Sequence, residues 1–343
     1  MAEVPQSYLE DASGLTGHAT EFAAPSAADE LSAILADCSR RSMPVTFSGA
    51  GTGLVGGRIG AGGMIVSLEH FRRLEIHPGH AVAGAGVSLK ELHTAAQAAG
   101  QFYPPDPTEW TASVGGTIAT NASGSRSFLY GSTRRWIRSL TAVFIDGSIR
   151  TFRRGDAVDF PFTPLPAPLA RKHTAGYRLR EGMDWIDLLC GSEGTLAAVV
   201  EAELALLPQP AAMLSGVVFF PSPQAALAAV DLWRAIPQLR MLEYLDRASL
   251  GVLSAAYSDI PAGAQSALLI EQQLDSLPGD PIGDWIDRLD AAGALGEQSW
   301  FGETAQDRER FRAFRHLLPE AVNQRVQRNG FPKLNTDYAV PIE

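Results

Sequence analysis

The sequence Ser48-Gly49-Ala50-Gly51-Thr52-Gly53-Leu54-Val55-Gly56-Gly57 contains five glycines within ten residues. Glycine permits backbone conformations with positive φ and lets a ligand come close to the main chain. Successive N–H groups in such a loop form a binding site for an anion, and a diphosphate is a frequent occupant. The stretch therefore predicts an anion-binding loop.

Residues 51–56 match the dinucleotide-binding pattern G-x-G-x-x-G. That pattern indicates a Rossmann fold only when a strand precedes it and a helix follows directly. A short β-prone run, residues 44–47, does precede the loop. The following residues, 58–63, are too rich in glycine to begin a helix, and an apolar strand is expected at 64–68. We therefore predict a phosphate-binding loop between two strands, which disfavours a Rossmann-bound nicotinamide.

The length and composition favour a globular protein of two domains. The chain has 343 residues, of which 45% are hydrophobic, and this is enough for two cores. A net charge of −10 argues against a nucleic-acid partner, because phosphate backbones need a basic surface. Cys38 and Cys190 have no metal-ligand spacing, so we expect reduced thiols and no metal site. No run is long enough to span a membrane and no signal peptide is evident, so a cytoplasmic location is expected.

Periodicity predicts alternating helices and strands in both domains. In the first, Ser26 is expected to cap a helix ending near Arg41, and Ser88 with Glu91 forms a capping box. Further elements of the first domain are a strand at 80–84, a helix through 99, a hairpin over 139–152 and a strand ending near 207. Pro208 and Pro210 mark the boundary. The second domain is expected to be rich in βαβ units, with strands near 216–220, 241–245 and 267–272, and helices near 224–235, 247–255, 283–291 and 306–328.

Two more segments are small, polar and rich in glycine, residues 113–124 and 188–196. Taken alone, the first of them favours a tight turn between two strands. Together with the loop at 48–57, they suit a long, flat, anionic cofactor. Hydrolase motifs are missing: residues 191–194 do not form a G-x-S-x-G nucleophile elbow, and no G-K-[ST] follows the first loop.

On these residues the chain resembles the vanillyl-alcohol oxidase/p-cresol methylhydroxylase superfamily of FAD enzymes, in particular the branch of D-lactate, glycolate and D-2-hydroxyglutarate dehydrogenases. The matching segments are 49–57, 105–107, 114–116, 120–124, 130–131 and 189–196. The resemblance implies an α+β fold. It consists of an FAD-binding domain of two subdomains over residues 1–210, followed by a ferredoxin-like α/β cap domain over residues 211–343.

The resemblance also implies which residues contact FAD. The first loop would hold the diphosphate, and the later loops would line the flavin, ribityl and adenosine parts. The implied cofactor-binding residues are Gly49, Ala50, Gly51, Thr52, Gly53, Leu54, Pro105, Ser113, Gly115, Gly116, Asn121, Ser123, Gly124, Tyr130, Glu193, Gly194 and Val199. Branches that attach FAD covalently carry a histidine in the first loop. Thr52 stands near that position here, so non-covalent FAD is expected.

The implied reaction is hydride transfer from the α-carbon of a small 2-hydroxy acid to the flavin, which gives a 2-oxo acid. Arg315 stands where the resembling enzymes place the arginine that binds the substrate carboxylate. Taken alone, it would be interpreted as an exposed helix arginine. The electron acceptor is open between a quinone, a cytochrome and an electron-transfer flavoprotein, and a homo-oligomer or a partner subunit is compatible with the sequence.

The end of the chain departs from the resembling enzymes. Residues 335–341 resemble a strand from the middle of the cap domain, and in the family a long segment with metal-binding histidines and the general base follows. The cap is therefore expected to be C-terminally incomplete. The alternative function is an FAD-binding subunit, or a catalytically incomplete fragment, that needs a partner chain. Another alternative is an oxidase of sugars, alcohols or ether-lipid precursors.

Overall fold

The computed structural model describes residues 4–168, 170, 172, 174–275, 277, 279–330 and 338–341. Its contacts divide the chain into two compact units. The first unit combines residues 1–123, 132–209 and 332–343, and the second combines 124–131 and 210–331. Within the described residues, no helix is both long and apolar enough to cross a membrane. Within the segment expected as a strand at 335–341, residues 335–337 lie outside them, and residues 338–341 form no strand.

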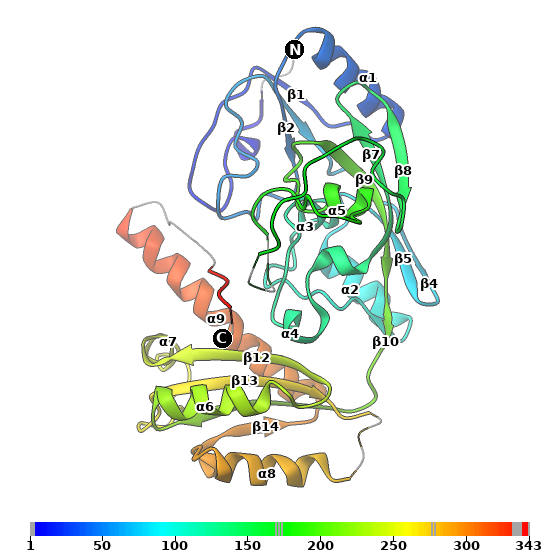
Figure 1. Cartoon of the computed structure of the whole chain (residues 1–343). Coiled ribbons are helices and arrows are strands. Elements are labelled where there is room, and N and C mark those ends of the chain that lie inside the picture. Colours follow the sequence, from blue (N-terminus) through cyan, green and yellow to red (C-terminus); the bar gives the residue numbers. More distant parts are fainter. Residues whose placement is uncertain are drawn as a thin grey trace. The chain divides into compact units, whose positions relative to one another are not determined.

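The first unit contains a five-stranded sheet in the order β4-β5-β9-β7-β8, and each neighbouring pair is antiparallel (Figure 1). The predicted hairpin is present, and its turn has Gly147 at φ 87°. The strands are β4 (Leu74–His77), β5 (His80–Gly84), β7 (Ile137–Phe144), β8 (Ile149–Arg153) and β9 (Ala197–Ala205). Short elements connect or flank them: η1 (Gln6–Tyr8), β6 (Gln101–Phe102), η2 (Thr133–Trp136), α5 (Trp185–Leu189) and β10 (Leu207–Pro208).

A second, parallel sheet of this unit carries the glycine loop. Its order is β1 (Glu21–Ala23), β3 (Met64–Ser67) and β2 (Val45–Ser48). As predicted, residues 49–63 join β2 to β3 without a helix. The strand β2 therefore ends directly at the loop, so the position of the loop is fixed by the sheet.

Helix α1 (Ala28–Arg40) packs against strands of both sheets of the first unit. Leu31, Leu35 and Cys38 recur at helical spacing and are fully buried against residues of β3, β7 and β9. Burying a leucine contributes roughly 1.5–3 kcal/mol, so this stripe stabilises both sheets together. The expected N-cap is wrong: Ala27 occupies the N-cap position of α1 without a side-chain hydrogen bond, and the N–H and hydroxyl of Ser26, one residue earlier, donate to the Glu30 carboxylate.

Helix α2 (Leu89–Ala98) begins as predicted, with a capping box between Ser88 and Glu91. Helix α3 (Val114–Ala119) stands where residues 113–124, taken alone, favoured a turn between strands. Glycine has a low helix propensity, so local sequence does not predict α3. Tertiary packing stabilises the helix instead, since Val114 and Ile118 are buried in the core beside the five-stranded sheet.

The second unit has a four-stranded antiparallel sheet in the order β12-β13-β11-β14. Its elements follow the chain as β11-α6-β12, then β13-α8-β14, with α7 inserted and α9 last. This is the βαββαβ order of ferredoxin-like folds, and the ferredoxin-like assignment stays a prediction that the order supports. The elements are α4 (Ser127–Tyr130), β11 (Met213–Phe220), α6 (Pro223–Trp233), β12 (Leu239–Asp246), α7 (Arg247–Leu253), β13 (Ser266–Gln273), α8 (Pro281–Ala291), η3 (Gly296–Gln298), β14 (Trp300–Gly302) and α9 (Ala305–Asn329).

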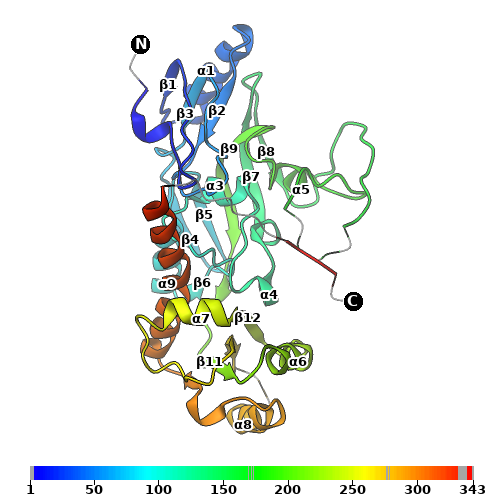
Figure 2. The ribbon, with the colours of Figure 1, turned by 90° about the vertical axis from the view of Figure 1, so that its left-hand side faces the viewer.

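Helices cover both faces of this sheet: α6 and α8 lie on one face, and α7 and α9 lie on the other (Figure 2). Alternate residues of β11 explain this arrangement. Val218 and Phe220 pack under α6 and α8, whereas Val217 and Phe219 pack under α7 and α9. A strand buried on both faces reads as a continuous apolar run, and all eight residues of β11 are buried.

Candidate cofactor site

The glycine loop passes close to its neighbours, and at two of its positions a side chain would displace a neighbouring side chain. A Cβ added at Gly49 would lie 2.8 Å from Ser113 Oγ, the oxygen that caps α3. At Gly51, where φ is 75°, a Cβ would lie 2.4 Å from Arg58 Cζ. Both distances are too short for a real Cβ, so a side chain at position 49 would displace the Ser113 hydroxyl, and one at position 51 would displace the Arg58 guanidinium. The positive φ of Gly51 is a further reason for glycine there.

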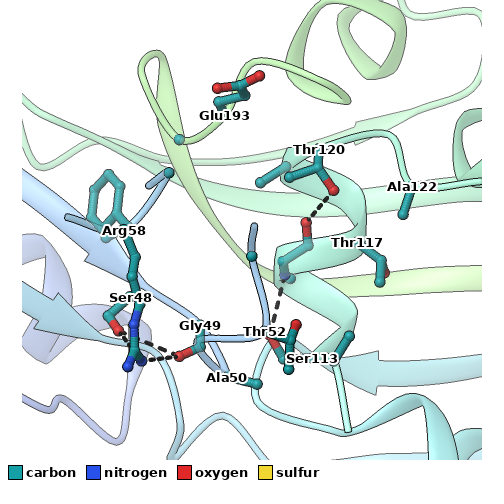
Figure 3. Close-up of a pocket in the computed structure, with 18 of the residues that line it drawn as sticks. Ser48, Gly49, Ala50, Thr52, Arg58, Ser113, Thr117, Thr120, Ala122 and Glu193 are labelled. Atoms are coloured by element: carbon teal, nitrogen blue, oxygen red, sulfur yellow. Dashed lines mark hydrogen bonds between the residues drawn. The ribbon is translucent and has the colours of Figure 1, made fainter. Parts of the chain in front are cut away.

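Arg58 binds the base of the loop (Figure 3). Its Nη1 donates to Ser48 Oγ and to the Gly49 carbonyl, each at 3.2 Å. On its other side, Nε donates to the Glu10 carbonyl at 2.8 Å, and Nη2 donates to the Ser7 carbonyl. All of these acceptors are uncharged. The guanidinium therefore ties the N-terminal segment to the glycine loop and brings a positive charge there.

Helix α3 lies across from the loop (Figure 3). Ser113 Oγ accepts a hydrogen bond from the Gly116 N–H at 3.3 Å, which starts the helix. Gly115 packs so closely that a Cβ there would lie 2.8 Å from the Cβ of Ala85. The close approach of Gly49 to Ser113 and Gly116 places the start of α3 next to the glycine loop.

The third loop meets the far end of α3. The Gly191 N–H donates to the Ile118 carbonyl at 2.9 Å, and the Glu193 N–H donates to the Ala119 carbonyl at 2.8 Å. The chain can turn here because residues 191, 193 and 194 all have positive φ. The structure thus brings together three loops that are far apart in the sequence.

A cavity of about 350 Å³ lies between these three segments, within the first unit. Binding sites for small molecules and cofactors begin at about this size. Twelve of the predicted cofactor residues line it. They are Gly49, Ala50, Gly51, Thr52, Gly53, Leu54, Ser113, Gly115, Gly116, Glu193, Gly194 and Val199.

Five predicted residues do not line this cavity: Pro105, Asn121, Ser123, Gly124 and Tyr130. Pro105 is buried, and Asn121 Oδ1 accepts the Arg134 N–H at 3.0 Å. Ser123 ends a segment of the first unit, and Gly124 begins the segment 124–131 of the second. In that segment, Tyr130 lies beneath the Arg240 guanidinium, 5.4 Å from ring centroid to Cζ.

Sequence reasoning missed several lining residues, above all Asp11, Arg58 and Glu109. The sequence did contain a reason to select Arg58, because it is the one cationic residue in the glycine-rich stretch 48–63. No sequence pattern indicated Asp11, because it lies outside every motif described above. Thr117 lies in α3, and Thr120 and Ala122 follow its end; they belong to the segment 113–124, which the sequence indicated without these residues being named.

No histidine or cysteine occurs among the described residues that line the cavity. Cys190 lies next in sequence to the lining residue Leu189, but its side chain is buried away from solvent, and burial raises the pKa of its thiol to about 12. A thiol with so high a pKa is a poor nucleophile. Groups of three or more potential metal ligands are also lacking in the described part of the chain.

Arg315, the predicted substrate arginine, belongs to α9 of the second unit. Its Nη2 donates to Glu243 Oε1 at 2.8 Å, and its Nε donates to Oε2 at 2.5 Å. Both side chains are partly buried. The guanidinium is therefore held in one orientation by a strand residue of the same unit.

Comparison with known proteins agrees with this site. A model of the FAD binding domain matches residues 19–153. D-lactate dehydrogenase of Archaeoglobus fulgidus is 39% identical, over 60% of this chain and 43% of that protein. Glycolate oxidase subunit GlcD of Bacillus subtilis is 31% identical, over 87% of this chain and 62% of that protein. The chain therefore spans less than two thirds of either relative.

The fold also resembles a solved structure of alkyldihydroxyacetonephosphate synthase. The TM-score is 0.65 with 18% sequence identity, and the match covers 89% of this chain and 59% of that one. At this identity the likeness concerns the fold alone.

Proposed function

This chain contains an FAD binding domain of the p-cresol methylhydroxylase type and is related to D-lactate dehydrogenase and glycolate oxidase; from this premise we propose that it is an FAD-dependent oxidoreductase. Its substrate is a small 2-hydroxy acid of the D-lactate, glycolate or D-2-hydroxyglutarate type, which it oxidises to the 2-oxo acid. The observation that carries the proposal is the cavity between three glycine-containing loops, which combines main-chain N–H groups with walls rich in glycine and alanine.

The residues present fit FAD. Backbone N–H groups of Gly49–Leu54 would bind the diphosphate, and Arg58 at the base of the loop supplies a nearby positive charge. Cavity walls formed by glycine and alanine let a flat ring system approach the main chain. When bound, FAD supplies the hydride acceptor of the reaction.

The cofactor is bound without a covalent link. The described lining residues offer no histidine or cysteine to form one, and Thr52 occupies the middle of the first loop. Affinity then depends on non-covalent contacts with the residues that line the cavity. Acid or heat should release the flavin intact from the protein.

Arg315 binds the carboxylate of the hydroxy acid in this proposal. A guanidinium is planar and can bind a carboxylate at two points, as Arg315 does with Glu243 through two nitrogens. The carboxylate of Glu243 keeps the guanidinium plane fixed, which favours a defined approach of a second carboxylate. A quinone, a cytochrome or an electron-transfer flavoprotein completes the cycle as electron acceptor.

The test is product formation. The FAD-loaded protein is incubated with an artificial electron acceptor and D-lactate, glycolate or D-2-hydroxyglutarate, and the 2-oxo acid is measured. We expect stoichiometric 2-oxo acid with at least one substrate. Bound flavin without any product would instead favour an FAD-binding subunit that needs a partner chain.

A further inference from the structure

The N-terminal segment of residues 7–17 lies against the glycine loop and is fixed to it. Its Ala12 N–H donates to the Gly51 carbonyl at 3.2 Å. Arg58 binds the carbonyls of Ser7 and Glu10 from the other side. These contacts hold Asp11 beside the loop, and Asp11 lines the cofactor cavity. The segment precedes the region that matches the FAD binding domain, residues 19–153.

The two carboxylate oxygens of Asp11 have different surroundings. Oδ1 accepts the Ser13 N–H at 2.9 Å and also the Ser13 hydroxyl. Oδ2 is buried and has no hydrogen-bond partner among the described residues. It faces the loop, since a Cβ added at Gly53 would lie 3.6 Å from Oδ2. Burying such an oxygen without a donor costs free energy, so a donor from the ligand is expected at this place.

The chemistry of FAD restricts which group this donor can be. A diphosphate offers only acceptors at neutral pH, so it cannot satisfy a carboxylate oxygen. Sugar hydroxyls flank the diphosphate on both sides, and carboxylates bind ribose hydroxyls in other dinucleotide sites. We propose that Asp11 Oδ2 accepts a hydrogen bond from a sugar hydroxyl of FAD, on the adenosine ribose or on the ribityl chain. The inference rests on the FAD site of the proposed function.

The test compares FAD affinity between the wild type and Asp11→Asn, measured by fluorescence titration of the full chain after removal of flavin. The Ser13 N–H keeps the amide oxygen of the new asparagine in the place of Oδ1, so its NH₂ group faces the sugar. The sugar hydroxyl then meets a neutral amide in place of a carboxylate oxygen and loses a charge-assisted hydrogen bond, so we expect FAD affinity to fall by about tenfold. Unchanged affinity would overturn the proposal. Tighter binding would overturn it too, because it would show that the side chain faces the phosphates.

Two variants control for charge and for folding. Glu10→Gln makes the same charge change one residue away, on an exposed side chain that does not line the cavity. Ser13→Ala removes the hydroxyl contact to Oδ1 and leaves Oδ2 in place. Both should bind FAD within about twofold of the wild type. If Ser13→Ala lost as much affinity as Asp11→Asn, the turn alone would explain the effect and the proposal would fail.

Two fragments of FAD, used as competitors, distinguish the two sugars. Weaker competition by ADP in Asp11→Asn assigns the hydroxyl to the ribose, and weaker competition by FMN assigns it to the ribityl chain. Loss of FAD affinity with no change for either fragment contradicts the proposal. If the wild type bound no FAD at all, the proposed function itself would be contradicted. This result can be distinguished from a failure of the proposal for Asp11, which leaves FAD binding by the wild type intact.

Discussion

Arg315 of α9 and Glu243 of β12 form a two-point ion pair, with Nη2 2.8 Å from Oε1 and Nε 2.5 Å from Oε2. The pair connects the last helix of the second unit to an edge strand of its sheet. Planar two-point binding of a carboxylate is the property for which arginine differs from lysine. A residue expected from the sequence to bind a substrate carboxylate is thus already oriented by a protein carboxylate.

We expect Arg315→Ala to reduce the rate of flavin reduction by a 2-hydroxy acid by about 100-fold, since two charge-assisted hydrogen bonds are lost. FAD content should not change, because Arg315 does not line the cofactor cavity. Glu243→Gln keeps the arginine, so it should reduce the rate of flavin reduction by about tenfold or less. Stopped-flow absorbance measures both rates. Equal losses in the two variants would mean that Arg315 serves only the ion pair.

Gly115→Ala should destabilise the first unit and weaken FAD binding together. The new Cβ would lie 2.8 Å from the Cβ of Ala85 and 3.2 Å from its carbonyl oxygen, so α3 must move away. Overpacking of this kind costs about 1–3 kcal/mol. Thermal unfolding and flavin titration measure the two effects.

The matched control is Gly251→Ala in α7, where a new Cβ meets nothing within 4 Å. An alanine in a helix interior is favoured over glycine by roughly 0.5–1 kcal/mol, so this variant should be as stable as the wild type or more stable. A Gly115→Ala variant that matched it in stability and FAD affinity would show that α3 tolerates the extra methyl group.

Arg58→Ala should release the N-terminal segment from the glycine loop. Hydrogen bonds to Ser7, Glu10 and Gly49 carbonyls disappear together. Limited proteolysis should then cleave within the first twenty residues sooner, and FAD affinity should fall about tenfold with the loss of a charged group. Arg40→Ala is the control, since Arg40 is 69% exposed and pairs with Asp37 in its own helix. Identical proteolysis of the two variants would contradict this role of Arg58.

The two thiols should be unreactive in the folded protein. Cys38 and Cys190 are both buried, and burial raises the pKa of each thiol, for Cys190 to about 12. At pH 8 a thiol reagent should therefore modify neither thiol until a denaturant unfolds the chain, when both should react. Fast reaction of one thiol in the native state would show that its surroundings open readily.

The strands and the first loop could be predicted because local signals determine them. Val45–Ser48 and Met64–Ser67 are short apolar runs next to glycine, and the capping box of Ser88 and Glu91 is read directly from the sequence. The helices of the second unit were predicted for the same reason, since their periodicity is regular. In such segments local propensity and tertiary structure agree.

Helix α3 and the role of Asp11 could not be predicted from the sequence. The glycines of α3 lower its intrinsic propensity, and its formation depends on packing against Ala85 and on the Ser113 cap. Asp11 reaches the cavity only because Arg58 and Gly51 hold a distant segment in place. Both features depend on contacts between residues far apart in the chain.

The central claim is tested most directly by the flavin absorbance of the purified, FAD-loaded protein on anaerobic mixing with D-lactate, glycolate and D-2-hydroxyglutarate. We predict that the absorbance of oxidised flavin disappears after mixing with at least one of these acids. The corresponding 2-oxo acid should leave this absorbance unchanged. A flavin that stays oxidised with all three acids, although dithionite reduces it, would contradict the proposed 2-hydroxy-acid oxidation.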